Sequence, residues 1–251
     1  MKKTILCTTM AAILLMFSCQ KDNSQEESNT ELANQKEDWL KADLDSKFAN
    51  SQKQVTAYLF STNEMAALVN TPNITEVRFV LGYSDNTIQI SVTGIDKSGK
   101  KLGTVASTIL KESNYDSKLD KLKVLSVSKT NKRTALLNAH LLLPKDALTG
   151  IQAWQEKLSS VSDLDFVTSY EGLRFRHFSL ESEVVKSMVD KANVANVGLF
   201  LGINPQGKVT TILIGLDENN NFKMSSSVSK EVNEVYDMTE PCPPNGSPED
   251  E

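Results

Sequence analysis

Two stretches of this chain match each other, and the match limits the possible folds more than any other feature of the sequence. The stretches are ITEVRFVLGYSDNTIQISVTGID at 74–96 and VANVGLFLGINPQGKVTTILIGLD at 194–217. The identical positions, in order, are Val77/Val197, Leu81/Leu201, Gly82/Gly202, Gly94/Gly215 and Asp96/Asp217. The two stretches begin 120 residues apart, at 74 and 194, and this period exceeds a solenoid unit of roughly 20–50 residues. We therefore predict two pseudo-equivalent units that arose by duplication.

The match extends outward on both sides of these stretches. We align Trp39 with Trp154 and Tyr115-Asp116 with Tyr236-Asp237. We also align Phe60-Ser61 with Phe178-Ser179. A series of identities in the same order is not expected by chance, so the repeat is predicted to cover most of the chain.

Each unit is predicted to begin with a helix and a strand. Leu40, Leu44 and Phe48 recur at helical spacing, and Pro144 is suited to open the matching helix of the second unit. Strands follow at 54–60 and 172–178. In the latter, alternation places Leu173, Phe175 and His177 on one face and Arg174, Arg176 and Phe178 on the other.

A second helix and a β-hairpin complete each unit. Ser61-Thr62-Asn63-Glu64 has the capping-box pattern, in which Ser and Glu satisfy free N–H groups at a helix start. SDN and NPQG are typical hairpin turns between the two closing strands. The prediction is an α+β protein of two duplicated α-β-α-β-β subdomains packed together.

The N-terminus has the pattern of a secretory signal. Met1-Lys2-Lys3 is basic, and the apolar run 5–17 is too short to span a bilayer. MFSC, ending at Cys19, resembles the lipobox of bacterial lipoproteins, although Met16 and Phe17 depart from its stricter enterobacterial form. The resemblance implies cleavage before Cys19 and lipidation of Cys19, where two or more acyl chains give stable anchoring. The alternative is an ordinary signal cut at a small residue.

The residues after Cys19 bear on the membrane to which the protein is exported and on the face of that membrane where its body lies. CQKDN resembles the surface-export signal of lipoproteins from Bacteroidota-type bacteria, with Asn23 where a second acid would stand. The resemblance covers the first 23 residues and implies a lipid anchor in the outer membrane with the body exposed at the surface. A periplasm-facing body, with Lys21-Asp22 as plain polar tether, is the alternative.

These patterns divide the chain into six predicted segments. They are a signal peptide at 1–18, a disordered tether at 19–33, a first unit at 34–116, a connecting segment at 117–143, a second unit at 144–238 and a disordered acidic tail at 239–251. The lysines of 118–133 are expected to belong to a solvated linker or edge strand, with an acidic-polymer contact as the alternative.

Motifs for catalysis, metal binding or cofactor binding do not stand out. The chain has two histidines, His140 and His177, both predicted to pack or lie at an edge, and no His-Glu-x-x-His, Cys-x-x-Cys, Walker or Gly-x-Gly-x-x-Gly pattern. The run DENNN at 217–221 has calcium-loop spacing, but Phe222 and Val228 replace the required Gly and Glu. We interpret Asp96 and Asp217 as turn residues that bond their own backbone.

Charge and composition narrow the function further. A net charge of −5 provides no attraction to nucleic acid, so no nucleic-acid partner is predicted. Cys242 has no partner nearby in sequence and is left as a free thiol or an intermolecular bridge. We predict a lipid-anchored, non-enzymatic binding or structural module of the cell envelope, with an envelope protein or small ligand as partner. The alternative is a hydrolase with a carboxylate pair in a cleft between the halves.

Overall fold

The computed structural model describes residues 23–127, 133–222, 231–232, 235–237 and 240–245. Helices and antiparallel sheets alternate along the chain, which confirms the α+β class. Two sheets dominate. The first, sheet one, has the strand order β5-β1-β11-β12-β14-β7, and the second, sheet two, has the order β15-β10-β2-β3-β4.

The helices and strands follow the predicted order with additions. The first unit contains α1 (Asn23–Lys41), α2 (Ser46–Gln52), β1 (Ala57–Ser61), α3 (Thr62–Val69), β2 (Ile74–Ser84), β3 (Thr87–Asp96), β4 (Lys101–Ala106) and β5 (Thr108–Leu110). The connection contains α4 (Asp116–Leu119), η1 (Asp120–Lys123), β6 (Ser126–Val127), α5 (Ala135–Ala139) and β7 (Leu141–Leu142). The second unit contains α6 (Pro144–Lys157), η2 (Val161–Asp163), α7 (Leu164–Val167), β8 (Ser169–Tyr170), β9 (Leu173–Arg174), β10 (His177–Glu181), α8 (Ser182–Val189), β11 (Asn196–Ile203), β12 (Val209–Leu216), β13 (Glu231–Val232), β14 (Val235–Asp237) and β15 (Glu240–Cys242).

The two units exchange strands, which corrects the picture of two separate subdomains packed together. β1 of the first unit pairs with β11 of the second, with Phe60 opposite Val197. Reciprocally, β10 of the second unit pairs with β2 of the first, with Leu180 opposite Val77. The same sequence offset relates both pairs, as expected for pseudo-twofold symmetry. Each sheet therefore contains strands from both units. That the symmetry arose by duplication stays a prediction.

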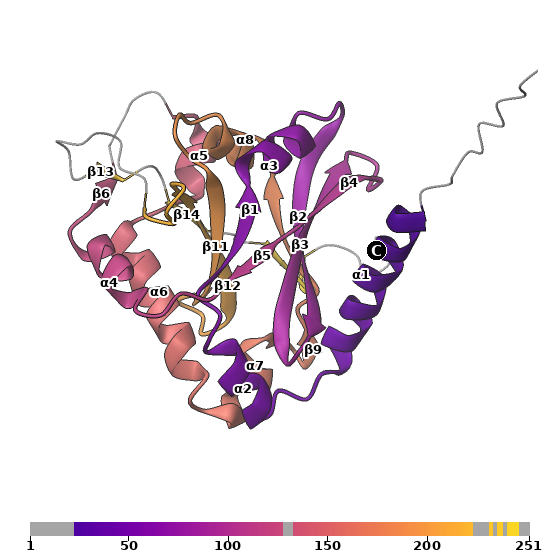
Figure 1. Ribbon diagram of the computed structural model, residues 1–251, viewed down its shortest axis with the longest axis vertical. Coiled ribbons are helices and arrows are strands. Elements are labelled where there is room, and N and C mark those ends of the chain that lie inside the picture. The colour runs from indigo at the N-terminus through magenta and orange to yellow at the C-terminus, as the bar shows by residue number, and fades with distance from the viewer. Residues whose placement is uncertain (1–22, 128–132, 223–230, 233–234, 238–239, 246–251) are drawn as a thin grey trace, which may run out of the picture.

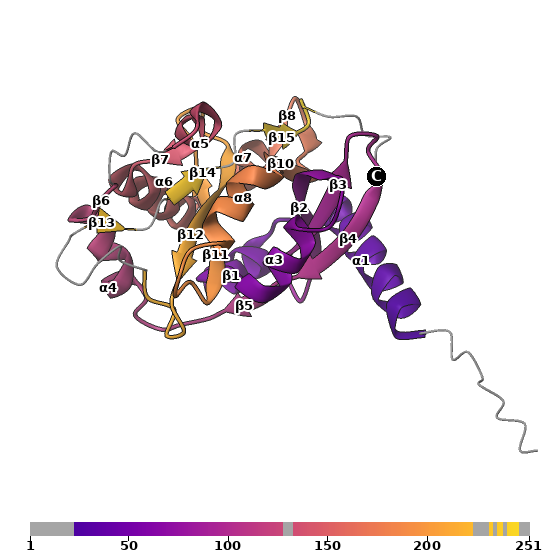
Figure 2. The same ribbon diagram turned by 90° about the horizontal axis from the view of Figure 1, so that it is seen from above.

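The two sheets lie face to face between two outer helices, α1 on one side and α6 on the other (Figure 1). Alternate residues of β2 and β11 point into the space between the sheets and join one apolar core. Those residues are Val77, Phe79, Leu81, Val197, Leu199 and Leu201. Helices α3 and α8, one from each unit, pack against each other at one end of this core (Figure 2).

The outer faces of the two sheets differ in polarity. Phe200, Ile212 and Ile214 of sheet one form a second apolar core with α6. On sheet two, the face beneath α1 carries Arg78 and Ser91 among its buried residues. The outer face of sheet one is therefore the more apolar of the two. Burial of apolar surface holds α6 on sheet one, whereas α1 packs on a more polar surface of sheet two.

Equivalent glycines let each outer helix approach its sheet. A Cβ atom added at Gly82 would lie 3.0 Å from Cβ of Gln35 in α1. A Cβ atom added at Gly202 would lie 3.3 Å from the backbone carbon of Gly150 in α6 and 2.6 Å from Cδ1 of Ile212. The Leu-Gly pairs noted in the sequence thus mark where the helices cross the sheets, as glycine permits close backbone approach.

Two of the outward alignments are wrong. β1 and β10 place Phe60 and Leu180 in equivalent positions, so the alignment of Phe60 with Phe178 is displaced by two residues. A displacement of two leaves every side chain on the same face of a strand, so the hydrophobic pattern does not reveal it. Tyr115 precedes α4, whereas Tyr236 lies in β14, so these tyrosines are not equivalent either.

The predicted capping box is also wrong. Ser61 immediately precedes α3 but makes no side-chain cap hydrogen bond. The backbone N–H of Thr62 instead donates to the carbonyl oxygen of Ala195, at 3.0 Å. The exchanged strands thus satisfy one free N–H group at the start of α3, that of its first residue.

Both ends of the body are more ordered than the composition indicated. The predicted tether is helical from Asn23, in a stretch rich in good helix formers and closed by a Glu37–Lys41 ion pair. Cys19 lies outside the described residues. In the predicted tail, Glu240–Cys242 form β15, an edge strand, where the missing N–H of Pro241 is tolerated.

The connecting segment is not simply a solvated linker. Leu119 and Leu122 are buried in the second apolar core, and η1 packs against α6.

Among the described residues, no helix is long and apolar enough to cross a membrane.

Candidate binding site

A cavity of about 570 Å³ opens where the C-terminal end of α1 meets the second unit. We call it the corner pocket. Its walls are Leu40 of α1, Asp165 and Phe166 of α7, the β8–β9 hairpin, Arg176, and Cys242 with Pro243. Its size lies within the range of small-molecule and peptide sites, about 300–1,000 Å³.

The β8–β9 hairpin forms one wall of the pocket, and a two-residue turn joins its strands. Glu171 and Gly172 occupy the two central positions with φ values of +50° and +81°. Positive φ at both positions is the signature of the tight turn that matches strand twist, and glycine adopts it without strain. The hairpin pairs Tyr170 with Leu173 and Ser169 with Arg174.

Arg174 joins this hairpin to α1. Its Nη1 donates to the carbonyl oxygens of Trp39, at 2.9 Å, and Ala42, at 2.7 Å. Its Nη2 pairs with the carboxylate of Asp165. Carbonyls at a helix C-terminus lack intrahelical partners, so a guanidinium there satisfies them and favours the negative end of the helix dipole.

The rim of the corner pocket exposes large apolar side chains. Of the lining residues, Phe166 is 65% exposed and Leu173 is 63% exposed. Tyr170, the strand partner of Leu173, is 38% exposed. Lys208 caps this rim, with Nζ 3.5 Å from the ring centroid of Phe166. Desolvation lowers the pKa of Lys208 below its ordinary value. An apolar cluster beside cations is a surface suited to recognition rather than to solvent contact.

Cys242 has a histidine neighbour that the sequence did not reveal. Cys242 of β15 stands opposite His177 of β10, so both side chains point to the same face of sheet two. His177 is 1% exposed and Cys242 is 2% exposed, and Cys242 forms no disulfide. The prediction that His177 packs inside is confirmed. Leu173, predicted to share its face, is instead exposed because β9 and β10 are separate strands.

His140 is a packed residue, as expected. It ends α5, and its Nε2 lies 3.0 Å from the carboxylate of Glu181. Its Nδ1 is buried without a hydrogen-bond partner. His140 and His177 lie on different elements, and the corner pocket is lined by neither.

Asp96 and Asp217 are turn residues, as predicted. Oδ1 of Asp96 accepts from the N–H groups of Ser98 and Lys100, at 2.8 and 3.0 Å. Oδ1 of Asp217 accepts from Asn219 and Asn221 at the same spacing, at 2.8 and 2.9 Å. The hydrogen bonds of Asp96 lower its pKa. The DENNN run is thus explained by its turn, and no group of three or more metal-binding side chains occurs among the described residues.

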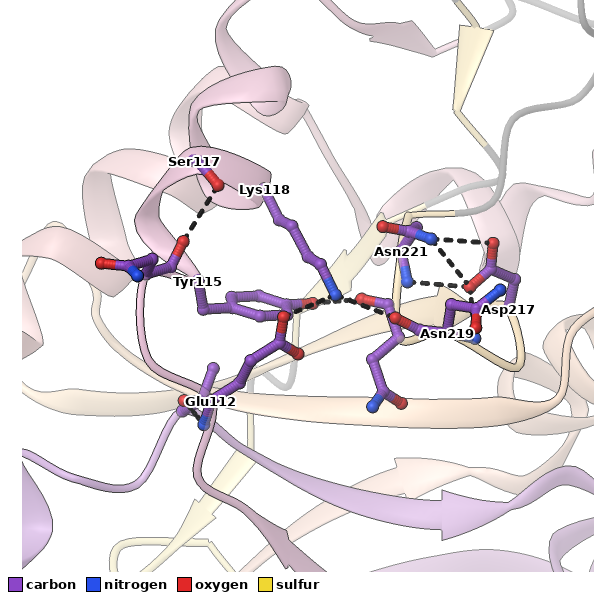
Figure 3. A network of polar contacts seen from close by, with 10 residues as sticks. Glu112, Tyr115, Ser117, Lys118, Asp217, Asn219 and Asn221 are labelled. Carbon is purple, nitrogen blue, oxygen red and sulfur yellow. Dashed lines mark hydrogen bonds and ion pairs between the residues drawn. The ribbon is translucent and has the colours of Figure 1, made fainter.

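Tyr115 and Lys118 fasten the end of the first unit to this second turn (Figure 3). The hydroxyl of Tyr115 donates to the carbonyl oxygen of Asn220 at 2.9 Å. Nζ of Lys118 donates to the carbonyl oxygen of Asn219 at 2.8 Å and pairs with Glu112 at 2.7 Å. Burial raises the pKa of Tyr115. We interpret this cluster as a structural clamp between the units.

A cavity of about 550 Å³ beside the clamp bears on the hydrolase alternative. It has Glu112 and Asp116 in its walls, together with Ile151 and Gln155 of α6. The carboxylate of Glu112 is paired with Nζ of Lys118, so this acidic side chain is already engaged. In the corner pocket the acidic side chain is Asp165, which is paired with Arg174. The corner pocket thus holds one carboxylate, whereas the cavity beside the clamp holds two, Glu112 and Asp116, of which Glu112 is engaged by Lys118.

Comparisons with protein-family models, with curated proteins and with solved structures found no match. Sequence reasoning missed the corner pocket, although Tyr170-Glu171-Gly172-Leu173 is a recognisable tight-turn signal.

Proposed function

We propose that the protein is a lipid-anchored envelope protein that binds a ligand in the corner pocket and holds it away from the membrane. The observation that supports this is the course of α1. Only Gln20, Lys21 and Asp22 separate Cys19 from the start of α1, and Leu40 near its other end lines the pocket.

The helix replaces the flexible tether as the spacer. At 1.5 Å per residue, the 19 residues of α1 span about 28 Å. Acyl chains on Cys19 would hold the first turn at the bilayer surface, and α1 would carry the pocket to its far end. The proposed destination, the outer membrane, is inferred from the residues that follow Cys19. The body would then lie at the cell surface or face the periplasm.

Binding rather than catalysis fits the chemistry of the pocket. Its lining combines the exposed apolar side chains of Phe166 and Leu173 with Arg174 and Arg176, and its acidic group, Asp165, is held in an ion pair with Arg174. Apolar walls with a few oriented polar groups are typical of ligand sites. The hydrolase alternative would need a second carboxylate in this cavity.

Anchoring is tested in a bacterial host fed an alkyne-bearing palmitate analogue. We expect the wild-type protein and a Cys242→Ala control to become labelled, and Cys19→Ala to remain unlabelled. Labelling of Cys19→Ala, or no labelling of the wild type, would contradict the proposal. Protease treatment of intact cells then distinguishes the surface from the periplasm.

Ligand capture is tested with an anionic apolar dye, anilinonaphthalene sulfonate. Phe166→Ser and Leu173→Ser should each weaken dye binding several-fold. The matched controls are Val124→Ser and Leu143→Ser, because these residues are 61% and 57% exposed on other elements. Equal effects in both sets would show that the dye reports general surface hydrophobicity and not the pocket.

A further inference from the structure

The corner pocket and the cavity of about 550 Å³ beside the clamp lie at matching places in the two units. We call the second one the clamp cavity. β5 pairs with β1, with Leu110 opposite Ala57, and β15 pairs with β10, with Cys242 opposite His177. Ala57 and His177 are 120 residues apart, the same separation that relates β2 to β11. β5 and β15 are therefore equivalent edge strands, one in each sheet.

One backbone hydrogen bond is repeated beside both cavities. The N–H of Thr56 donates to the carbonyl oxygen of Leu110 at 2.8 Å, and the N–H of Arg176 donates to the carbonyl oxygen of Cys242 at 2.7 Å. Thr56 lines the clamp cavity, whereas Arg176 and Cys242 line the corner pocket. The segment that leads into β1 or β10 is thus fastened to its edge strand in the same way at each site.

The outer helices complete the match. Each helix crosses its sheet at one of the equivalent glycines, α1 at Gln35 and α6 at Gly150. Five residues later along each helix, Leu40 of α1 lines the corner pocket and Gln155 of α6 lines the clamp cavity. The same backbone frame therefore surrounds two cavities of similar volume, about 570 and 550 Å³.

The side chains on this shared frame differ in polarity. Three apolar residues of the corner pocket are replaced by polar residues in the clamp cavity, and the pairs are Leu40/Gln155, Leu173/Lys53 and Pro243/Lys111. The first pair follows from the helix crossings, the second from the separation of 120 residues, and the third from the paired edge strands. The two cavities are therefore suited to different ligands.

The charges of the clamp cavity favour an anion. Lys53 and Lys111 are exposed, and neither forms an ion pair within the described part of the chain. Of the two acidic residues in the walls, Glu112 is paired with Lys118 (Figure 3), so the two lysines face the charge of Asp116 alone. The whole chain has a net charge of −5, and this local excess of positive charge attracts a negatively charged ligand.

The remaining walls suit a small hydroxylated molecule. Val55, Leu119 and Ile151 are buried and give the cavity apolar surface. Gln54 and Gln155 add carboxamides, which both donate and accept hydrogen bonds. Apolar walls with a few polar groups are typical of small-molecule sites. Amides match sugar hydroxyls, apolar side chains match the C–H face of a sugar ring, and lysines match a carboxylate.

We propose that the clamp cavity is a second ligand site, and that its ligand is a small hydrophilic carboxylate of the uronic-acid class. Lys53 and Lys111 bind the carboxylate, and Gln54 and Gln155 bind the hydroxyls. The protein thus carries two sites on one repeated frame, the corner pocket for an apolar ligand and the clamp cavity for an acidic one. The inference goes beyond the proposed function, because it requires neither the lipid anchor nor a ligand in the corner pocket.

The test titrates the intact protein with glucuronate, and with glucose as the neutral counterpart, and follows binding by saturation-transfer NMR. Glucose should bind about 10-fold more weakly than glucuronate, because it lacks the charge that the lysines bind. Lys53→Gln and Lys111→Gln should each weaken glucuronate binding about 2- to 5-fold, as expected for exposed charge pairs. Added salt should weaken it as well.

The matched controls are Lys97→Gln and Lys101→Gln, which remove the same charge from exposed lysines outside the cavity. Phe166→Ser is the control for the corner pocket. All three should bind glucuronate as the wild type does. The proposal is overturned if glucuronate does not bind, if glucose binds equally well, or if any control weakens binding as much as Lys53→Gln does. Dye binding and palmitate labelling are measured separately, so they show whether the proposed function survives.

Discussion

The guanidinium of Arg174 lies 5.1 Å from the ring centroid of Trp39 and donates a hydrogen bond to the Trp39 carbonyl oxygen. In return, the indole Nε1 of Trp39 donates to the carbonyl oxygen of Phe175 at 2.6 Å. One residue belongs to α1 and the other to the β8–β9 hairpin. Their contact therefore locks the first unit to the second at the edge of the corner pocket.

Replacing Arg174 with Lys should loosen this junction. Lysine keeps a charge but cannot reach two carbonyls and a carboxylate at once or stack on the indole. We expect a loss of about 1–3 kcal/mol in the free energy of unfolding, measured by urea denaturation. Lys41→Ala is the control, because its ion pair with Glu37 is exposed and should leave the midpoint unchanged. An unchanged midpoint for Arg174→Lys would contradict the role given to this junction.

Tyr58→Phe should destabilise the core through unpaired polar groups. The Tyr58 hydroxyl accepts from Nε2 of Gln52 at 3.1 Å and donates to the carbonyl oxygen of Ile88 at 3.0 Å. The N–H of Ile88 in turn donates to Oε1 of Gln52 at 2.9 Å, which closes a buried ring of hydrogen bonds. Loss of the hydroxyl should cost about 1–3 kcal/mol in chemical denaturation. At the equivalent position, Phe178→Tyr should also destabilise, because no such ring is described there.

Alkaline pH should destabilise the protein through its buried phenols. Burial is the main reason why the pKa values of Tyr58 and Tyr115 are raised above their ordinary value. A raised folded pKa leaves stability intact below the unfolded value of about 10 and lowers it as pH rises beyond that value, since the unfolded chain ionises first. The free energy of unfolding, measured at pH values from roughly 8 to roughly 11, should show this decline. Tyr58→Phe should flatten it, and an equal slope in that variant would disprove the assignment.

The exchanged strands predict how the chain behaves when it is divided. Fragments separated within 128–132 should each fail to form a stable fold alone, because β1 and β10 then lack their partners β11 and β2. Co-expressed fragments should assemble and purify together. Two independently folded fragments, with cooperative unfolding transitions of their own, would show that the strand exchange is not essential.

Cys242 should resist alkylation in the folded protein. It is 2% exposed, and thiol reagents reach such a group only when the structure opens locally. Iodoacetamide modification measured by mass spectrometry should rise sharply in urea, with Cys242→Ser as the control. Rapid modification without denaturant would instead assign Cys242 to the accessible surface of the pocket.

The sequence anticipated the features that depend on short-range chemistry. Pro144 begins α6, and both aspartates that follow the closing strands bond to the backbone two and four residues later. Turn geometry and helix starts need only neighbouring residues, so a single sequence carries them. Over 23–33 the structure shows a helix where the sequence predicted a tether, because polar composition alone does not separate an isolated coil from a helix that packs on a sheet.

The candidate site could not be read in the same way, because its walls come from α1, the β8–β9 hairpin and β15, which are distant in sequence. By itself, the sequence determined the α+β class, the repeated hairpins and the turns, since these follow from local periodicity and turn chemistry. The tertiary structure decided that Phe60 would pair with Val197 and Leu180 with Val77, exchanging strands between the units. Hydrophobic alternation specifies which face of a strand is buried, and the choice of partner strand depends on which packing buries both faces together.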